Sequence, residues 1–141
     1  MEPTYGRFPL KLDEKYRLII PARARPDLAG GVYLAQGPYH CVFMFSAEQF
    51  GAFRKRLRKT TVPGIRGNDL DRVFHASLVT VDMDRQGRIT IPPGLRGWAH
   101  LEHDVVVVGN WSGLEIWDAG IWAEYNDQYS EIYSTAISEV R

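Results

Sequence analysis

Two short turns carry the residues of this chain that are best suited to binding a polyanion. Residues 13–17 read DEKYR and residues 84–88 read DRQGR, so each turn opens on an aspartate and closes on an arginine four positions later. The planar guanidinium offers two parallel donors that fit a phosphate or the O6/N7 edge of guanine. The aspartate can accept from the amides of its own turn, or pair with the arginine and fix its direction. The spacing predicts either a DNA contact or a structural turn closed by an Asp–Arg pair, and by itself leaves both open.

Both turns belong to an internal repeat whose copies align at a shift of 71 residues. The shift places Asp13 on Asp84, Arg17 on Arg88, Ile20 on Ile91, Pro21 on Pro92 and Arg25 on Arg96. After a one-residue gap, VYLAQG at 32–37 aligns with DVVVVG at 104–109. Chance similarity rarely keeps its register this long, and two copies are too few for a solenoid. The repeat therefore predicts two halves, residues 1–71 and 72–141, that close one core around a pseudo-twofold axis.

Each copy reads as short strands followed by a helix. Runs of β-branched and aromatic residues predict strands at 8–12, 18–20, 32–35 and 41–45 in the first copy, and at 78–83, 89–91, 104–108 and 113–117 in the second. Pro21 and Pro92 end the second strand of each copy, because proline cannot donate to a strand ladder. Ser46 and Asp118 are placed to cap the helices that follow. These elements predict a mixed fold, mainly β with flanking helices.

Two of the predicted helices carry faces that need a partner. The helix that follows Ser46 holds five basic side chains within six positions, Arg54, Lys55, Arg56, Arg58 and Lys59. Such a cluster is usually a solvated face, but it could also lie along DNA phosphate or face the acidic half of a neighbouring subunit. A connecting helix is predicted at 69–77. The C-terminal helix carries an apolar stripe from Trp122 to Ile137, which predicts docking on the body or on a neighbouring subunit.

The charges are balanced overall but unevenly placed. The 141 residues include 17 basic and 17 acidic side chains, and 45% of the chain is hydrophobic. Residues 1–71 hold 12 basic and 7 acidic side chains, whereas residues 72–141 hold 5 and 10. The resulting +5 and −5 favour head-to-tail contacts between subunits, or one basic face for a polyanion. Cys41 is the only cysteine and no stretch approaches the length of a membrane span, so we expect a cytoplasmic protein without a membrane partner.

The ordered motifs of both copies resemble a known family. The segment LDEKYRLIIPAR and the longer segment MDRQGRITIPPGLRGWAHLEHDVVVVGNWSGLEIWDAGIW are similar to the two repeats of the MraZ family of bacterial regulators. That family belongs to the wider AbrB/SpoVT-like group of swapped-hairpin β-barrels. The match covers residues 5–125 approximately, and the second copy is the closer one. The resemblance implies a duplicated AbrB/MraZ-like β-barrel with pseudo-twofold symmetry, in which each half is one AbrB-like repeat.

The same resemblance implies a function. Members of the family act as sequence-specific DNA-binding transcriptional regulators, here a repressor, at the promoter of a division and cell-wall gene cluster. Their chains associate into a homo-oligomeric ring on double-stranded DNA, and the D-x-x-x-R turns of different subunits read successive short direct repeats. The implied location is the cytoplasm, in association with the nucleoid. No cofactor is implied.

The DNA-binding residues implied by the motif lie in the two turns. Arg17 and Arg88 are carried over from the family, with Lys15 beside the first and Gln86 beside the second. Arg85 is added from its charge and position alone. Asp13, Tyr16, Asp84 and Gly87 are expected to shape the turns or contact DNA.

Tyr16 departs from the family pattern, in which glycine usually precedes the first arginine. If that position requires a positive φ, tyrosine is strained there by about 1–2 kcal/mol. If it does not, the turn takes another shape and the ring is offered to a sugar or a base.

Other classes of protein find less support in the sequence. A catalytic dyad would have to come from His40 and Cys41, and a metal site from His100 and His103, which lack the i, i+4 spacing of a zinc protease motif. We therefore expect no enzyme activity and no metal. The alternative function is an AbrB-type antitoxin or a protein-interaction module. The C-terminal segment reads as an amphipathic helix rather than the disordered tail of an antitoxin.

Overall fold

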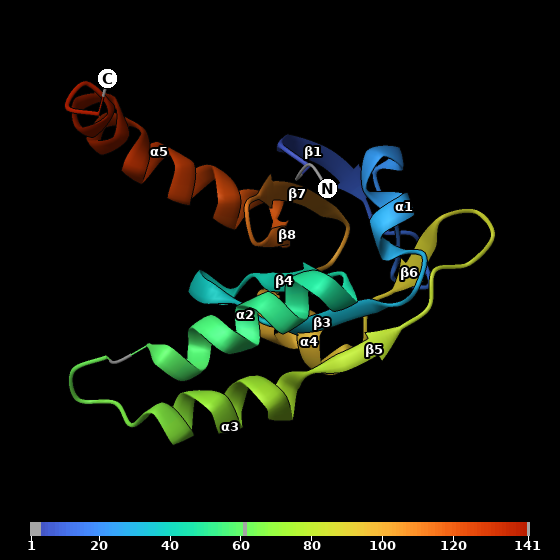
Figure 1. Cartoon of the computed structure of the whole chain (residues 1–141). Helices are drawn as coiled ribbons and strands as arrows, with labels where there is room; N and C mark the ends of the chain where they lie inside the picture. The colour runs from blue at the N-terminus through green and yellow to red at the C-terminus, as the bar shows by residue number, and fades with distance from the viewer. Residues whose placement is uncertain (1–3, 61, 141) are drawn as a thin grey trace.

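The computed structural model describes residues 4–60 and 62–140 (Figure 1). Its strands are β1 (Gly6–Lys11), β2 (Arg17–Ile19), β3 (Val32–Gln36), β4 (Val42–Phe45), β5 (Val79–Val81), β6 (Arg88–Thr90), β7 (Asp104–Asn110) and β8 (Gly113–Asp118). Within the described residues they form a six-stranded sheet of order β1-β7-β8-β4-β3-β5 and a two-stranded ribbon of β2 and β6. All of the pairings are antiparallel. The predicted strands are confirmed, and their ends shift by at most two residues.

The strand order has the symmetry that an internal repeat would produce. The repeat relates β1 to β5, β3 to β7 and β4 to β8, so the order β1-β7-β8-β4-β3-β5 reads the same from either edge. The first strand of each half pairs with the other half, β1 with β7 and β5 with β3. This exchange is consistent with the duplicated swapped-hairpin barrel. The division at residues 71 and 72 stays a prediction, because the halves share one sheet.

The helices flank this sheet. The α-helices are α1 (Arg25–Leu28), α2 (Ala47–Lys59), α3 (Gly67–Ser77), α4 (Pro93–Ala99) and α5 (Ala119–Ile137), and two 3-10 turns, η1 (Ala22–Ala24) and η2 (Pro38–His40), complete the described segments. Both predicted caps are confirmed. The Ser46 side chain accepts from the amide of Gln49, whose own side chain accepts from the Ser46 amide, and Asp118 accepts from the amide of Ile121.

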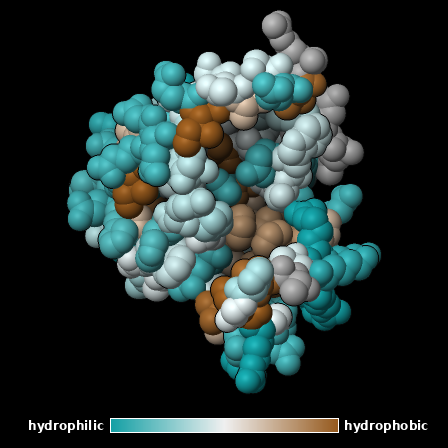
Figure 2. All heavy atoms as spheres, turned by 90° about the vertical axis from the view of Figure 1, so that its left-hand side faces the viewer, coloured by the Kyte–Doolittle hydropathy of each residue, from teal (hydrophilic) through white to brown (hydrophobic). Residues whose placement is uncertain are grey.

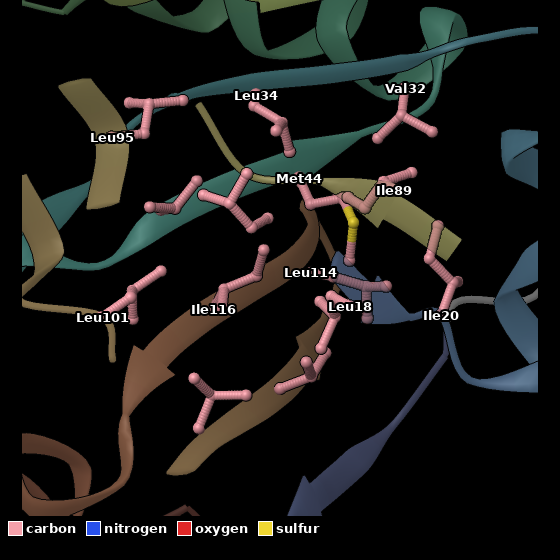
Figure 3. Close-up of a cluster of buried hydrophobic side chains, with 14 of the residues drawn as sticks. Leu18, Ile20, Val32, Leu34, Met44, Ile89, Leu95, Leu101, Leu114 and Ile116 are labelled. Carbon is pink, nitrogen blue, oxygen red and sulfur yellow. The ribbon is translucent and has the colours of Figure 1, made fainter. Parts of the chain in front are cut away.

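The main core lies between the sheet and the ribbon. Figure 3 shows side chains of both layers that meet there: Leu18, Ile20, Ile89, Val32, Leu34, Met44, Leu114 and Ile116. Alternate residues of β3 and β4 face the opposite way, where Ala35 and Phe45 pack with Phe74 of α3. These two strands are therefore buried on both faces, by the core on one side and by the α2–α3 hairpin on the other. The mixed fold class is confirmed, with a β core and helices outside it.

Two further sequence predictions concern Cys41 and the membrane. The Cys41 side chain is fully buried, and burial raises the pKa of its thiol well above the ordinary value. A thiol in this state is a small hydrophobic core group and not a nucleophile. Within the described part of the chain, no helix combines the length and the apolar character that a membrane span requires.

Candidate nucleic-acid interface

The ribbon places the two predicted turns on one surface. In the antiparallel pairing, Arg17 lies opposite Thr90 and Ile19 lies opposite Arg88. Because side chains alternate along a strand, these four share one face of the ribbon. The other face carries Leu18 and Ile89, the central pair, which are 0% and 1% exposed. Ile19 on the outer face is 50% exposed, so the ribbon has a core side and a solvent side.

Each turn is also fastened to the strand of the other half. The amide of Ile91 donates to the carbonyl of Tyr16 at 3.0 Å, and the amide of Ile20 donates to the carbonyl of Gly87 at 2.8 Å. These two bonds are equivalent under the repeat. The turns therefore move with one ribbon, and the distance between Arg17 and Arg88 is set by the backbone.

An aspartate clamps the arginine of each turn. Asp13 Oδ1 accepts from the amides of Lys15 and Arg17, both at 2.9 Å, and Asp13 Oδ2 accepts from Arg17 Nε at 2.6 Å. The second turn repeats the arrangement. It lies directly before β6, which is labelled in Figure 1. Asp84 Oδ1 accepts from the amides of Gln86 and Arg88, and Asp84 Oδ2 accepts from Arg88 Nε, all at 2.9 Å.

This clamp reconciles the two interpretations that the sequence left open. The Asp–Arg pair is present in both turns, so each turn is a structural unit. The carboxylate occupies only Nε, however, and the two Nη groups form the edge of the guanidinium that can donate two parallel bonds to a ligand. The clamp therefore fixes the arginine without consuming its bidentate edge.

The clamps also lower the pKa of the two aspartates. The pKa of each carboxyl lies below its ordinary value of 3.8, chiefly because it accepts the backbone N–H of Arg17 or Arg88, and secondarily through the guanidinium itself. Both groups are thus charged at neutral pH, and the native state holds the charged form.

This shift gives the protein an acid-labile component. A carboxyl whose pKa is lower in the folded state adds stability above its unfolded pKa, and this stability is lost as the pH falls through the folded pKa. We expect the difference in unfolding free energy between wild type and Asp13→Asn/Asp84→Asn to be constant above about pH 5 and to shrink below about pH 4. Urea unfolding across this range measures it. A difference that persists undiminished at the acid end would contradict the charged clamp.

The residue before each arginine adopts a left-handed backbone. Tyr16 has φ 58° and Gly87 has φ 80°, so the turns have the same shape and the position does require a positive φ. The neighbouring arginines accommodate the difference in size. Arg25 donates from Nε to the carbonyl of Ile20 at 2.9 Å and lies where a Gly87 side chain would begin. Its repeat equivalent, Arg96, stacks on the Tyr16 ring with Cζ 3.7 Å from the ring centroid.

Variants at Tyr16 should separate the strain from the stacking. Tyr16→Ala keeps a residue with Cβ at positive φ and loses the cation–π contact, so we expect it to lose about 1 kcal/mol of stability. Tyr16→Gly loses the same contact but relieves a strain of about 1–2 kcal/mol, so it should be more stable than Tyr16→Ala. Urea unfolding of both variants tests the order. If Tyr16→Ala proves the more stable, the positive φ is not costly here.

The remaining candidate residues divide between the turns and more distant sites. Lys15, Arg85 and Gln86 are exposed at the two turns, beside the clamped arginines. The basic cluster of α2 is not near them. In Figure 1 the C-terminal end of α2 lies at the left of the molecule and β6 at the right, below α1. The structure therefore brings together the predicted residues of both turns and leaves the basic helix apart.

Four residues of this site were not predicted from the sequence. Arg25 and Arg96 support the turn of the opposite copy, and Ile19 and Thr90 complete the outer face between the clamped arginines. The repeat register was the available signal for the first pair, because it aligns these arginines as it aligns Arg17 with Arg88.

The histidine and cysteine candidates make structural contacts. His40 Nδ1 lies 2.8 Å from the carbonyl of Trp98, and Trp98 Nε1 donates to the carbonyl of Cys41 at 2.9 Å. The His40 and His100 rings are 5.8 Å apart between centroids. Residues 4–60 and 62–140 contain no group of three or more histidine, cysteine or acidic side chains that could hold a metal ion.

Comparisons with known proteins identify the class first. Curated relatives from Leifsonia xyli subsp. xyli, Thermobifida fusca and Arthrobacter sp. strain FB24 are each named "Transcriptional regulator MraZ". The first is 38% identical over 135 residues, which is 96% of this chain and 94% of the relative. The second is 40% identical over 130 residues, 92% and 91% of the two chains, and the third 41% over 115 residues, 82% and 81%. Transcriptional regulators of this kind are not enzymes.

The chain belongs to the MraZ family. The family described as "MraZ protein, putative antitoxin-like" matches residues 75–141, which includes the second turn. The relatives extend the similarity over nearly the whole chain and so include the first turn. The resemblance inferred from the turn motifs is confirmed, and a role in transcriptional regulation is supported.

Proposed function

We propose that the chain is a sequence-specific DNA-binding repressor that reads DNA with the outer face of the β2–β6 ribbon. The observation that carries this proposal is the pair of clamped arginines, Arg17 and Arg88, held on one exposed face by equivalent hydrogen bonds. A guanidinium fixed through Nε presents the geometry that discriminates guanine from other bases.

The dimensions of the ribbon fit the major groove. Arg17 and Arg88 lie two pairs apart along the ribbon, which is about 7 Å at the usual strand rise. The DNA rise is 3.4 Å per base pair, so the two arginines would meet bases roughly two steps apart. The major groove is about 12 Å wide and admits a two-stranded ribbon. Ile19 between the arginines is then placed to contact a thymine methyl group.

Exposed charges at the turn tips supply the affinity that does not depend on sequence. Lys15 and Arg85 are exposed on opposite turns and would meet phosphates on either side of the groove. Gln86 offers an amide that suits adenine. One ribbon makes few base contacts, so a single chain should bind weakly.

Assembly raises this weak affinity. Several chains joined in a ring place their ribbons on successive short direct repeats. Linkage of this kind raises the overall affinity by a factor of about 10²–10⁴. A ring on the promoter of a division and cell-wall gene cluster would exclude polymerase. This function places the protein in the cytoplasm with the nucleoid, bound to double-stranded DNA and without a cofactor.

Fluorescence anisotropy with the DNA upstream of the gene tests the proposal. We expect the native duplex to bind at least tenfold more tightly than a scrambled duplex of equal length, and both to weaken steeply between low and moderate salt. Equal binding of the two duplexes, or none, would reject direct readout. A second role as an antitoxin is favoured only by the words of the family description, and rescue of growth against a toxin encoded beside the gene would support it.

A further inference from the structure

The C-terminal helix α5 uses one apolar stripe in two different environments. In its first half, Trp122 and Tyr125 pack on Trp117 of β8, with ring centroids 5.3 and 4.9 Å apart, and Tyr125 also contacts Tyr39 at 5.0 Å. Tyr129 continues the cluster at 4.7 Å from Tyr125. This half anchors the helix to the sheet.

The second half of the stripe extends beyond the body. Every residue from 131 to 140 is exposed. The large apolar side chains there are Ile132, Tyr133 and Ile137 of α5 and Val140 just beyond it, with exposed fractions of 60%, 63%, 43% and 77%. In Figure 1 this end of α5 points away from the sheet and away from the α2–α3 hairpin. The apolar stripe predicts docking on the body or on a neighbouring subunit, and the body covers only half of it.

An apolar groove on the same molecule lacks a matching helix. It is lined mainly by Phe43 of β4, Phe53 and Leu57 of α2, and Leu70, Val73 and Phe74 of α3. Figure 2 views the side on which α5 and the α2–α3 hairpin project, and shows apolar surface recessed within a hydrophilic rim. Val73 at the edge of the groove is 59% exposed. The α5 helix of the same chain is anchored at its first half and directed elsewhere, so it does not fill this groove.

The charges of the two elements are complementary. Helix α2, which forms one wall of the groove, holds five basic side chains and one acidic, a net charge of +4. Helix α5 holds Glu124, Asp127 and Glu131 and no basic side chain, a net charge of −3, and its outer half contributes Glu131, with Glu139 just beyond the helix. Opposite charges favour the encounter of the two surfaces and disfavour the pairing of α5 with another α5.

We propose that the outer half of α5 from a second copy of this chain binds in the groove between α2 and α3. Each chain then offers a helix to one neighbour and a groove to the other, which is a head-to-tail interface of the kind that closes into rings. The helical part of this exposed segment, residues 131–137, makes about two turns and spans about 10 Å. The inference rests on the proposed function for the biological use of the ring, but the joint itself can be tested without DNA.

Two variants of the full chain test the joint from its two sides. The helix variant is Ile132→Asp/Ile137→Asp, and the groove variant is Val73→Asp. All three side chains are exposed, so the fold should be retained, and circular dichroism and the melting temperature check this. Matched controls are Ser134→Asp, on the opposite face of α5, and Asn68→Asp, on α3 away from the groove.

Sedimentation velocity gives the mass of each species. We expect wild type and both controls to form closed oligomers, and each variant to run as a monomer of 16.1 kDa. Mixing the two variants in equal amounts should give a dimer and nothing larger, because only one intact helix and one intact groove remain. A monomeric wild type, or wild-type mass in either variant, would overturn the proposal. So would a groove variant that dimerises alone, since that result indicates α5 pairing with α5.

The same variants keep this proposal separate from the proposed function. The helix variant should bind a duplex that carries one repeat with the affinity of a single wild-type chain. It should lose the additional affinity that wild type shows for a duplex with several repeats. Arg88→Ala should assemble normally and lose only the preference for the native duplex. Normal assembly without DNA binding therefore rejects the DNA role alone, and normal DNA preference with unchanged mass in both variants rejects the joint alone.

Discussion

Replacing both clamped arginines, in Arg17→Ala/Arg88→Ala, should reduce the preference for the native upstream duplex over a scrambled one by about 100-fold. A good bidentate contact to guanine is worth about 1–3 kcal/mol, and 1.4 kcal/mol corresponds to a factor of ten. Two independent contacts of this size multiply to the expected loss. Fluorescence anisotropy with both duplexes, at one fixed salt concentration, measures the ratio.

The choice of substitution separates readout from charge. Arg17→Lys/Arg88→Lys keeps both positive charges but replaces each planar fork with a point charge that cannot make two parallel bonds. We expect this variant to lose most of the preference while its affinity for the scrambled duplex stays near that of wild type. Arg85→Ala should instead weaken both duplexes alike and reduce the salt dependence. If Arg17→Ala/Arg88→Ala weakens binding to both duplexes equally, the clamped arginines contact phosphate and do not read bases.

Much of the candidate site could be predicted because its interactions are local. Asp13 and Arg17 are four residues apart, as are Asp84 and Arg88, and the amides that each aspartate accepts belong to the same turn. A pattern of this length fixes its own geometry, so the repeat of the letters predicted the repeat of the structure. The two helix caps were predictable for the same reason.

The interactions that sequence reasoning missed join residues far apart in the chain. The contact of Arg25 with Gly87, and that of Arg96 with Tyr16, link opposite copies, and no local pattern records such a partner. The pairing of β1 with β7 is non-local in the same way. The repeat predicted which elements are equivalent, but strand exchange between the halves followed only from the family resemblance.

The apolar stripe of α5 shows a different limit. Helical spacing shows which side chains share a face, and it contains no information on what covers that face. Trp122 and Ile132 belong to one stripe, yet the first packs on the sheet and the second is exposed. Because β8 ends directly before α5, the sheet contacts only the first half of the helix.

The ribbon itself should depend on the side chains beneath the arginines. Ile89 is 1% exposed and contributes to the main core, so Ile89→Ala should lose about 2–5 kcal/mol of unfolding free energy. For a chain of this size that loss lowers the melting temperature by roughly 3 °C per kcal/mol. Ile89→Val, which removes one methylene, should lose only about 0.5–1.5 kcal/mol.

A matched control lies on the other face of the same ribbon. Ile19 is 50% exposed between Arg17 and Arg88, so Ile19→Ala should change stability by less than about 0.5 kcal/mol. The two substitutions remove the same atoms. Ile89→Ala should therefore have the larger effect on stability, and Ile19→Ala the larger effect on DNA preference. Ile89→Ala should lower the melting temperature and leave the preference intact at a temperature where the protein is folded. If the outer face meets the bases, Ile19→Ala should leave the melting temperature unchanged and weaken the preference for the native duplex. An equal preference in both variants would place the DNA contact away from the centre of the ribbon.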